Sequence, residues 1–104
     1  MSSRIDQLLE LLKSEPDDSF LNYALALEYI KLEEREKARN IIETILKRDE
    51  NYLGAYYQLG QLYEQLQQLE KARVTYTKGI AIAQRQRNTK AAGELSTALL
   101  LIEE

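Results

Sequence analysis

Apolar residues recur along nearly the whole chain at the three- and four-residue spacing of amphipathic helices. No segment shows a convincing strand pattern. The spacing predicts about six helices, over residues 3–14, 19–32, 36–48, 52–66, 69–84 and from 89 onward. The expected fold class is therefore all-α.

Polar residues and one proline separate the predicted helices. Pro16 lacks an amide proton and biases Glu15 away from helical angles, so the first helix must end there. Short polar side chains at the breaks can accept hydrogen bonds from the free amides that begin a helix. The residues expected to do so are Ser2 or Ser3, then Asp17, Asp18 or Ser19, and then Asn51.

The segment 19–32 differs from the other predicted helices because apolar residues occupy nearly all of its sides. A helix of this kind is usually buried on several faces, or it keeps one face for a partner. The sequence leaves both interpretations open.

Residues 19–52 and 53–86 are two copies of one pattern, offset by 34 positions. Eight positions are identical between them, and four of these are consecutive. The identical pairs are Tyr23/Tyr57, Leu25/Leu59, Tyr29/Tyr63, Leu32/Leu66, Glu36/Glu70, Lys37/Lys71, Ala38/Ala72 and Arg39/Arg73.

The spacing within each copy resembles the tetratricopeptide repeat, whose signature is W-x2-L-G-x2-Y, then A-x3-F, then Pro. The second copy carries Tyr56-x2-Leu59-Gly60-x2-Tyr63 and then Ala72-x3-Tyr76. The first carries Leu25-Ala26-x2-Tyr29 and then Ala38-x3-Ile42, with Asn22 in place of the opening aromatic residue.

The closing proline of the signature is absent from both copies, where Glu50 and Gln84 stand instead. Pro16, however, falls where a repeat before the first copy would end. The resemblance implies a right-handed superhelical array of antiparallel helix hairpins. The single domain would comprise a half repeat at 1–18, repeats at 19–52 and 53–86, and a capping helix at 87–104.

The composition argues against catalysis. The chain has no Cys and no His, which removes thiol chemistry, the usual metal ligand and the usual general base at neutral pH. It also has no calcium-binding EF-hand spacing and no phosphate-binding glycine loop. We therefore expect a non-catalytic protein with no cofactor and no metal.

The N-terminal segment has only a short apolar stretch, which Asp6, Glu10 and Lys13 interrupt. This pattern is neither that of a signal peptide nor that of a membrane span. The expected location is the cytoplasm.

In tetratricopeptide arrays the first helices of successive hairpins line a concave surface, which commonly binds a peptide or a helix. The resemblance therefore implies a protein–protein interaction module, or scaffold. Its partner-binding residues would be Phe20, Tyr23, Leu27 and Ile30 in the first copy, with Tyr57, Gln61 and Glu64 in the second. Two alternatives stay open. In the first, these residues only pack against the chain's own terminal helices. In the second, the apolar helix 19–32 is buried against a second copy, and the chain is a homo-oligomer.

One subclass of the family grips the C-terminal carboxylate of chaperone tails through a Lys and Asn clamp on the concave surface. The matching positions of the first copy hold Tyr23 and Leu27, which are uncharged. The clamp is therefore absent, and the sequence argues against a chaperone-tail role.

A basic segment interrupts the acidic balance of the chain. The net charge is −3, yet residues 71–93 include six basic side chains and no acidic one: Lys71, Arg73, Lys78, Arg85, Arg87 and Lys90. Cations near a helix C-terminus are favourable, so a solvated, capped face explains the segment. The alternative is a site for an acidic partner, protein or nucleic acid. No aromatic residue accompanies the loop to stack on a base, which argues against nucleic acid.

Overall fold

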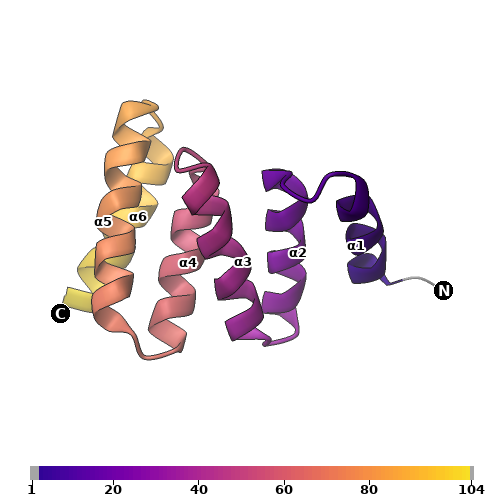
Figure 1. Cartoon of the computed structure of the whole chain (residues 1–104). Coiled ribbons are helices and arrows are strands. Elements are labelled where there is room, and N and C mark those ends of the chain that lie inside the picture. Colours follow the sequence, from indigo (N-terminus) through magenta and orange to yellow (C-terminus); the bar gives the residue numbers. More distant parts are fainter. Residues whose placement is uncertain (1–2, 104) are drawn as a thin grey trace. The chain divides into compact units, whose positions relative to one another are not determined.

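The structure, a computed structural model, describes residues 3–103. These residues form six α-helices and no strand (Figure 1). The helices are α1 (Arg4–Ser14), α2 (Ser19–Lys31), α3 (Arg35–Arg48), α4 (Gly54–Gln65), α5 (Leu69–Arg85) and α6 (Thr89–Glu103). The all-α prediction is confirmed. The chain divides into two compact units, a first unit of Met1–Glu50 and a second of Asn51–Glu104.

In the first unit, α2 packs against both α1 and α3. Leu8 of α1 is buried with Ala24 and Leu25 of α2, and partly buried apolar residues surround them. These surrounding residues are Ile5, Leu12, Leu21, Tyr29 and Ile41. The unusual apolar character of α2 thus follows in part from its two neighbours.

In the second unit, α5 packs against α4 on one side and α6 on another, and α6 has a smaller contact with α4. The largest fully buried side chains of this unit are Leu62, Tyr76, Ile82 and Leu95. Gly60 of α4 lies directly against the Tyr76 side chain of α5, because a Cβ atom at this residue would lie 2.1 Å from Cε1 of Tyr76. The Tyr76 ring therefore occupies the space that any larger residue at position 60 would need.

Side-chain caps fix the starts of three helices. The Ser3 hydroxyl accepts from the Asp6 amide in a capping box, whereas Ser2 lies outside the described residues. The Asp18 carboxylate accepts from the Leu21 amide at 2.8 Å. The Asn88 side chain accepts from the Ala91 amide at 3.0 Å at the start of α6.

The predicted cap at Asn51 is wrong. Helix α4 has no side-chain cap hydrogen bond, because the backbone of Leu53 is already helical and the chain enters α4 through a turn. Asn51 has another contact, since its carbonyl accepts a hydrogen bond from Nε2 of Gln86 at 2.8 Å.

Three helices end in the same kind of turn. Glu33, Gln67 and Arg87 follow α2, α4 and α5 with φ angles of 59°, 60° and 56°. In each turn the next amide donates back to a carbonyl five residues earlier, at 2.7–2.9 Å, as in the Schellman motif. The motif reverses the chain sharply and brings consecutive helices together. Among residues 3–103, no helix combines the length and apolar character needed to cross a bilayer.

Candidate functional site

The four apolar residues predicted as partner-binding in the first unit share one side of α2. Phe20, Tyr23, Leu27 and Ile30 are spaced by three and four residues. Phe20 is 67% exposed, and the other three are half-buried. None of them belongs to the apolar cluster that joins α1, α2 and α3. Helix α1 therefore packs on a different side of α2 and leaves Phe20 open to solvent.

In the second unit, Tyr57 of α4 lies beside a shallow groove. Its side chain is 37% exposed, and its ring centroid is 6.4 Å from that of Tyr76. The rest of the groove is lined by Thr89, Lys90, Gly93, Glu94 and Thr97 of α6. A Cβ atom at Gly93 would meet nothing within 4 Å, so the groove is open at that point.

Gln61 and Glu64, the other two residues predicted for this unit, bind the hydroxyl of the buried Tyr76. Nε2 of Gln61 donates to the Tyr76 oxygen at 2.7 Å. The Tyr76 hydroxyl in turn donates to the carboxylate of Glu64. Both polar residues of α4 are thus held in place by a residue of α5.

The surroundings of Tyr76 keep its hydroxyl protonated. Burial raises its pKa most, and the Glu64 carboxylate raises it further by accepting its hydrogen bond and by its negative charge. The hydroxyl therefore remains a donor at neutral pH, and the Gln61–Tyr76–Glu64 arrangement is stable there.

The predicted basic segment lies entirely in the second unit, and its six side chains are exposed. Lys71 and Arg73 have local partners. The Lys71 ammonium lies 5.8 Å from the centre of the Tyr63 ring. The Arg73 guanidinium pairs with Glu70, which raises the pKa of Arg73. These contacts favour the interpretation of a solvated helix face over a binding site for an acidic partner.

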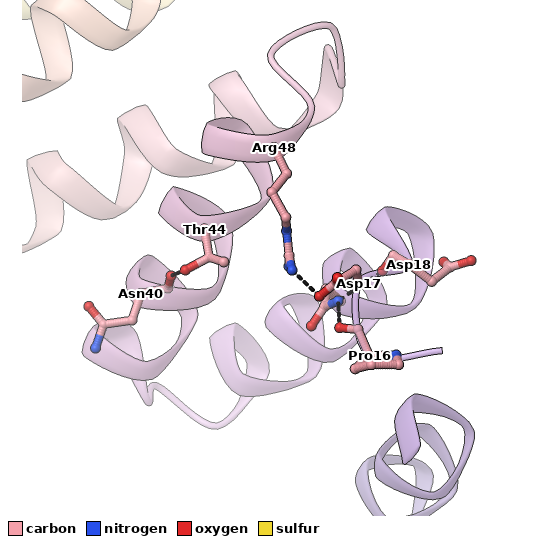
Figure 2. Close-up of polar contacts among 7 residues, drawn as sticks. Pro16, Asp17, Asp18, Asn40, Thr44 and Arg48 are labelled. Atoms are coloured by element: carbon pink, nitrogen blue, oxygen red, sulfur yellow. Dashed lines mark hydrogen bonds and ion pairs between the residues drawn. The ribbon is translucent and has the colours of Figure 1, made fainter. Parts of the chain in front are cut away.

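A polar cluster joins the turn between α1 and α2 to the end of α3. Asp17 pairs with Arg48 of α3, as Figure 2 shows. Nδ2 of Asn22 donates to the carbonyls of Pro16 and Asp18, at 3.0 and 2.9 Å. These contacts hold the turn in place. Over the described residues 3–103, no group of three or more Asp or Glu side chains is arranged to hold a metal ion.

The family model for the tetratricopeptide repeat matches residues 21–52 and 53–86, which is more than half of the chain. The chain belongs to the tetratricopeptide repeat family. The resemblance inferred from the repeated motif is confirmed.

Solved structures of tetratricopeptide repeat domains share the fold. A tetratricopeptide repeat domain protein from Salinibacter ruber, solved in solution, is 39% identical over 85% of this chain and 89% of its own, with a TM-score of 0.80. The TPR2B domain of yeast Sti1, solved in complex with pHsp70, is 17% identical over 95% of this chain and 79% of its own, with a TM-score of 0.87.

A third similar structure is the first TPR of Spaghetti (RPAP3), bound to the HSP90 peptide SRMEEVD. It is 22% identical over 96% of this chain and 78% of its own, with a TM-score of 0.76. No curated protein sequence matches the chain significantly.

Two features of the site were missed at the level of sequence. The groove residues of α6 were assigned only to a capping helix. The available signal was Gly93, a residue with low helix propensity in the middle of an otherwise favourable helical segment. The role of the Tyr76 hydroxyl was also missed. Its signal was the pair Gln61 and Glu64, which lie one turn apart and opposite the aromatic position of the repeat motif.

Proposed function

We propose that this tetratricopeptide protein is a non-catalytic interaction module, which binds a peptide or helix of another protein through the first helices of its two repeats. The contact residues are those predicted from the repeat register. They are Phe20, Tyr23, Leu27 and Ile30 on α2, with Tyr57, Gln61 and Glu64 on α4.

The exposure of Phe20 carries the proposal. An aromatic side chain that is 67% exposed on an apolar helix side is unfavourable in water. Burial against a partner removes this area from solvent, and aromatic side chains are frequent energetic anchors of interfaces. Two of the similar structures were solved with bound chaperone segments, so this fold is able to hold peptides.

The second repeat contributes a different chemistry. Tyr57 supplies a partly exposed ring beside the α6 groove, and Gln61 and Glu64 supply polar groups that Tyr76 holds in place. We therefore expect a ligand with an apolar part for α2 and hydrogen-bond donors for α4. Polar groups whose positions are already fixed lose little entropy on binding.

Selection of a peptide from a displayed library, followed by calorimetric titration, tests the proposal. Phe20→Ala and Tyr57→Ala are each expected to weaken binding by about 10- to 30-fold, the effect of losing an interface anchor of about 1.4–2 kcal/mol. Val74→Ala is the matched control, because Val74 of α5 is also exposed and apolar but lies outside the proposed site. Equal affinity for wild type and both aromatic variants would contradict the proposal.

The acidic chaperone peptide SRMEEVD provides a specificity test. The proposed residues of α2 include no cation, so this side has no partner for a carboxylate. We expect no measurable binding of this peptide at concentrations where a selected peptide saturates. Tight binding would show that another surface of the chain recognises acidic tails.

Self-association through α2 is the alternative, and the same exposed Phe20 favours it. Light scattering distinguishes the two functions. A dimer that Phe20→Glu converts to a monomer supports self-association through α2, whereas a wild-type chain that binds peptide as a monomer supports the interaction module.

A further inference from the structure

In the repeat register, helix α1 takes the position of the second helix of a hairpin. Its own unit contains no first helix to pair with it. In the 34-residue register, Leu11 of α1 is equivalent to Ile45 and Gly79. Gly79 faces the first helix of its own hairpin, since a Cβ atom there would lie 2.7 Å from Cβ of Tyr56. Leu11 has no such neighbour in the first unit, where α1 packs on α2, and it is 55% exposed.

Helix α6 has the complementary feature, because one of its flanks is built from small side chains. Its Leu95 and Ala98 are buried in the second unit, and Ala92 and Ser96 lie on the adjoining flank. If Leu95 is aligned with the buried Leu59 of α4, Ser96 takes the position of Gly60 and Ala92 takes that of Tyr56. A hollow lies beside Ala92, lined also by Ala83, Gln84, Arg87, Asn88 and Thr89.

We propose that α1 of a second copy of this chain packs antiparallel on this flank of α6 and completes a hairpin between two molecules. Leu11 of one copy would occupy the hollow beside Ala92 of the other. Ser96, one turn further along α6, is small enough to let α1 approach closely. The large side chain of Leu11 thus meets small residues on the other helix, as close packing requires.

The charges at both ends of the two helices support the antiparallel orientation. It brings Glu15, after the last residue of α1, near Arg87 and Lys90 at the start of α6. It also brings Arg4, at the start of α1, near Glu103 at the end of α6. Opposite charges therefore meet at each end, whereas the parallel orientation would place Arg4 among the cations.

An exposed leucine also lies close to the small-residue flank of α6. Leu100, four residues after Ser96, is 62% exposed. The proposed contact joins different surfaces of the two copies, so each copy keeps one free end and open chains can grow. A single helix pair buries less than the roughly 1,200 Å² of a stable interface, so the association is weak and depends on concentration.

Sedimentation velocity of the 104-residue chain, from low micromolar to millimolar concentration, tests the inference. The mass of wild type is expected to rise with concentration and to fall when salt is added. Leu11→Glu blocks one end and Ser96→Arg blocks the other, so each variant alone is expected to remain a monomer. An equimolar mixture of the two is expected to form dimers and nothing larger, because one intact α1 and one intact α6 remain.

Leu9→Glu is the matched control. Leu9 is 43% exposed on the same helix. Because it is two residues away from Leu11, it lies on nearly the opposite side of α1. Association should survive this change. Circular dichroism verifies folding, and Leu11→Ser and Ser96→Lys replace any variant that loses helicity.

Three results would overturn the inference: a monomeric wild type at every concentration, equal effects of Leu9→Glu and Leu11→Glu, or no dimer in the mixture. Association that is abolished by Phe20→Glu and unaffected by Leu11→Glu would also overturn it, and would support the α2 interface instead. The inference does not rest on peptide binding, so either can fail alone.

Discussion

The two complete repeats form equivalent hairpins with different side-chain sizes. In the hairpin α4–α5, Gly60 leaves room for the fully buried ring of Tyr76. In the hairpin α2–α3, the equivalent residues are Ala26 and Ile42, both completely buried. The second repeat thus has a smaller residue on the first helix and a larger one on the second.

One helical turn away, the sizes are reversed: the second repeat has the larger residue on its first helix and the smaller one on its second. Tyr56 of α4 is buried against Gly79 of α5, whereas the equivalent residues of the first repeat are Asn22 and Ile45. The Asn22 side chain donates to two carbonyls of the preceding turn. The first repeat therefore replaces an aromatic anchor by hydrogen bonds.

The comparison teaches that the hairpin constrains the combined volume of facing residues more than the identity of either one. Protein interiors are packed about as densely as organic crystals, so a larger side chain on one helix requires a smaller one opposite. The weak match of the first copy to the family motif is explained in this way.

Loss of the Tyr76 ring is expected to have the largest effect. Tyr76→Ala removes a fully buried ring and leaves Gly60 opposite a cavity, at a cost of about 3–5 kcal/mol. Urea denaturation followed by circular dichroism measures the change. Tyr57→Ala is the control, because that ring is partly exposed; equal losses would contradict the assigned packing.

A larger residue at position 60 tests the difference in packing between the two repeats. Gly60→Ala is expected to destabilise the second repeat by about 1–3 kcal/mol through overpacking against Tyr76. Adding Tyr76→Ile reproduces the pair of the first repeat, so the double variant should lose less than the sum of the single changes. Strict additivity in this double-mutant cycle would be evidence against volume compensation.

Asn22→Ala tests the hydrogen bonds peculiar to the first repeat. Loss of the two bonds to Pro16 and Asp18 is expected to lower the free energy of unfolding by about 1–2 kcal/mol. Asn40→Ala on the exposed side of α3 should change it by less than about 0.5 kcal/mol. An equal change in the free energy of unfolding for both variants would contradict the stabilising role of the Asn22 side chain.

Alkaline pH should weaken the second repeat through Tyr76, whereas Ile42 of the first cannot ionise. The raised pKa of Tyr76 contributes stability that is fully present below the unfolded value near pH 10. Above about pH 10 the unfolded chain loses this proton first, so stability falls by up to about 1.4 kcal/mol per pH unit. Stability measured against pH for wild type and Tyr76→Phe isolates the effect; parallel curves would refute it.

The smallest effect is expected at a turn that the two repeats share. Gln67→Gly and Glu33→Gly remove side chains from positions with φ near 60° and should each stabilise the chain by about 0.5–1 kcal/mol. Gln58→Gly, inside α4, should instead destabilise it by about 1 kcal/mol. Thermal denaturation measures these changes. Glu33 also pairs with Arg35, but this ion pair is exposed and contributes little, so a loss of stability in both turn variants would contradict the expectation.

The sequence by itself determined the six helices, the repeat register and the fold family. Helical periodicity and caps such as Ser3 and Asp18 are local, so a short window of residues contains the information. The prediction at Asn51 failed because the chain enters α4 through a turn in which Leu53 is already helical. The Asn51 carbonyl in this turn contacts Gln86, which is 35 residues away and outside any short window.

Only the tertiary structure decided how the predicted site residues are held. Gln61 and Glu64 looked like surface residues, yet Tyr76 binds both from a helix 15 and 12 residues away. The exposure of Phe20, the groove beside Tyr57 and the open flank of α6 likewise depend on which helix covers which side. Periodicity shows that a side is apolar, but its exposure depends on neighbours that are distant in sequence.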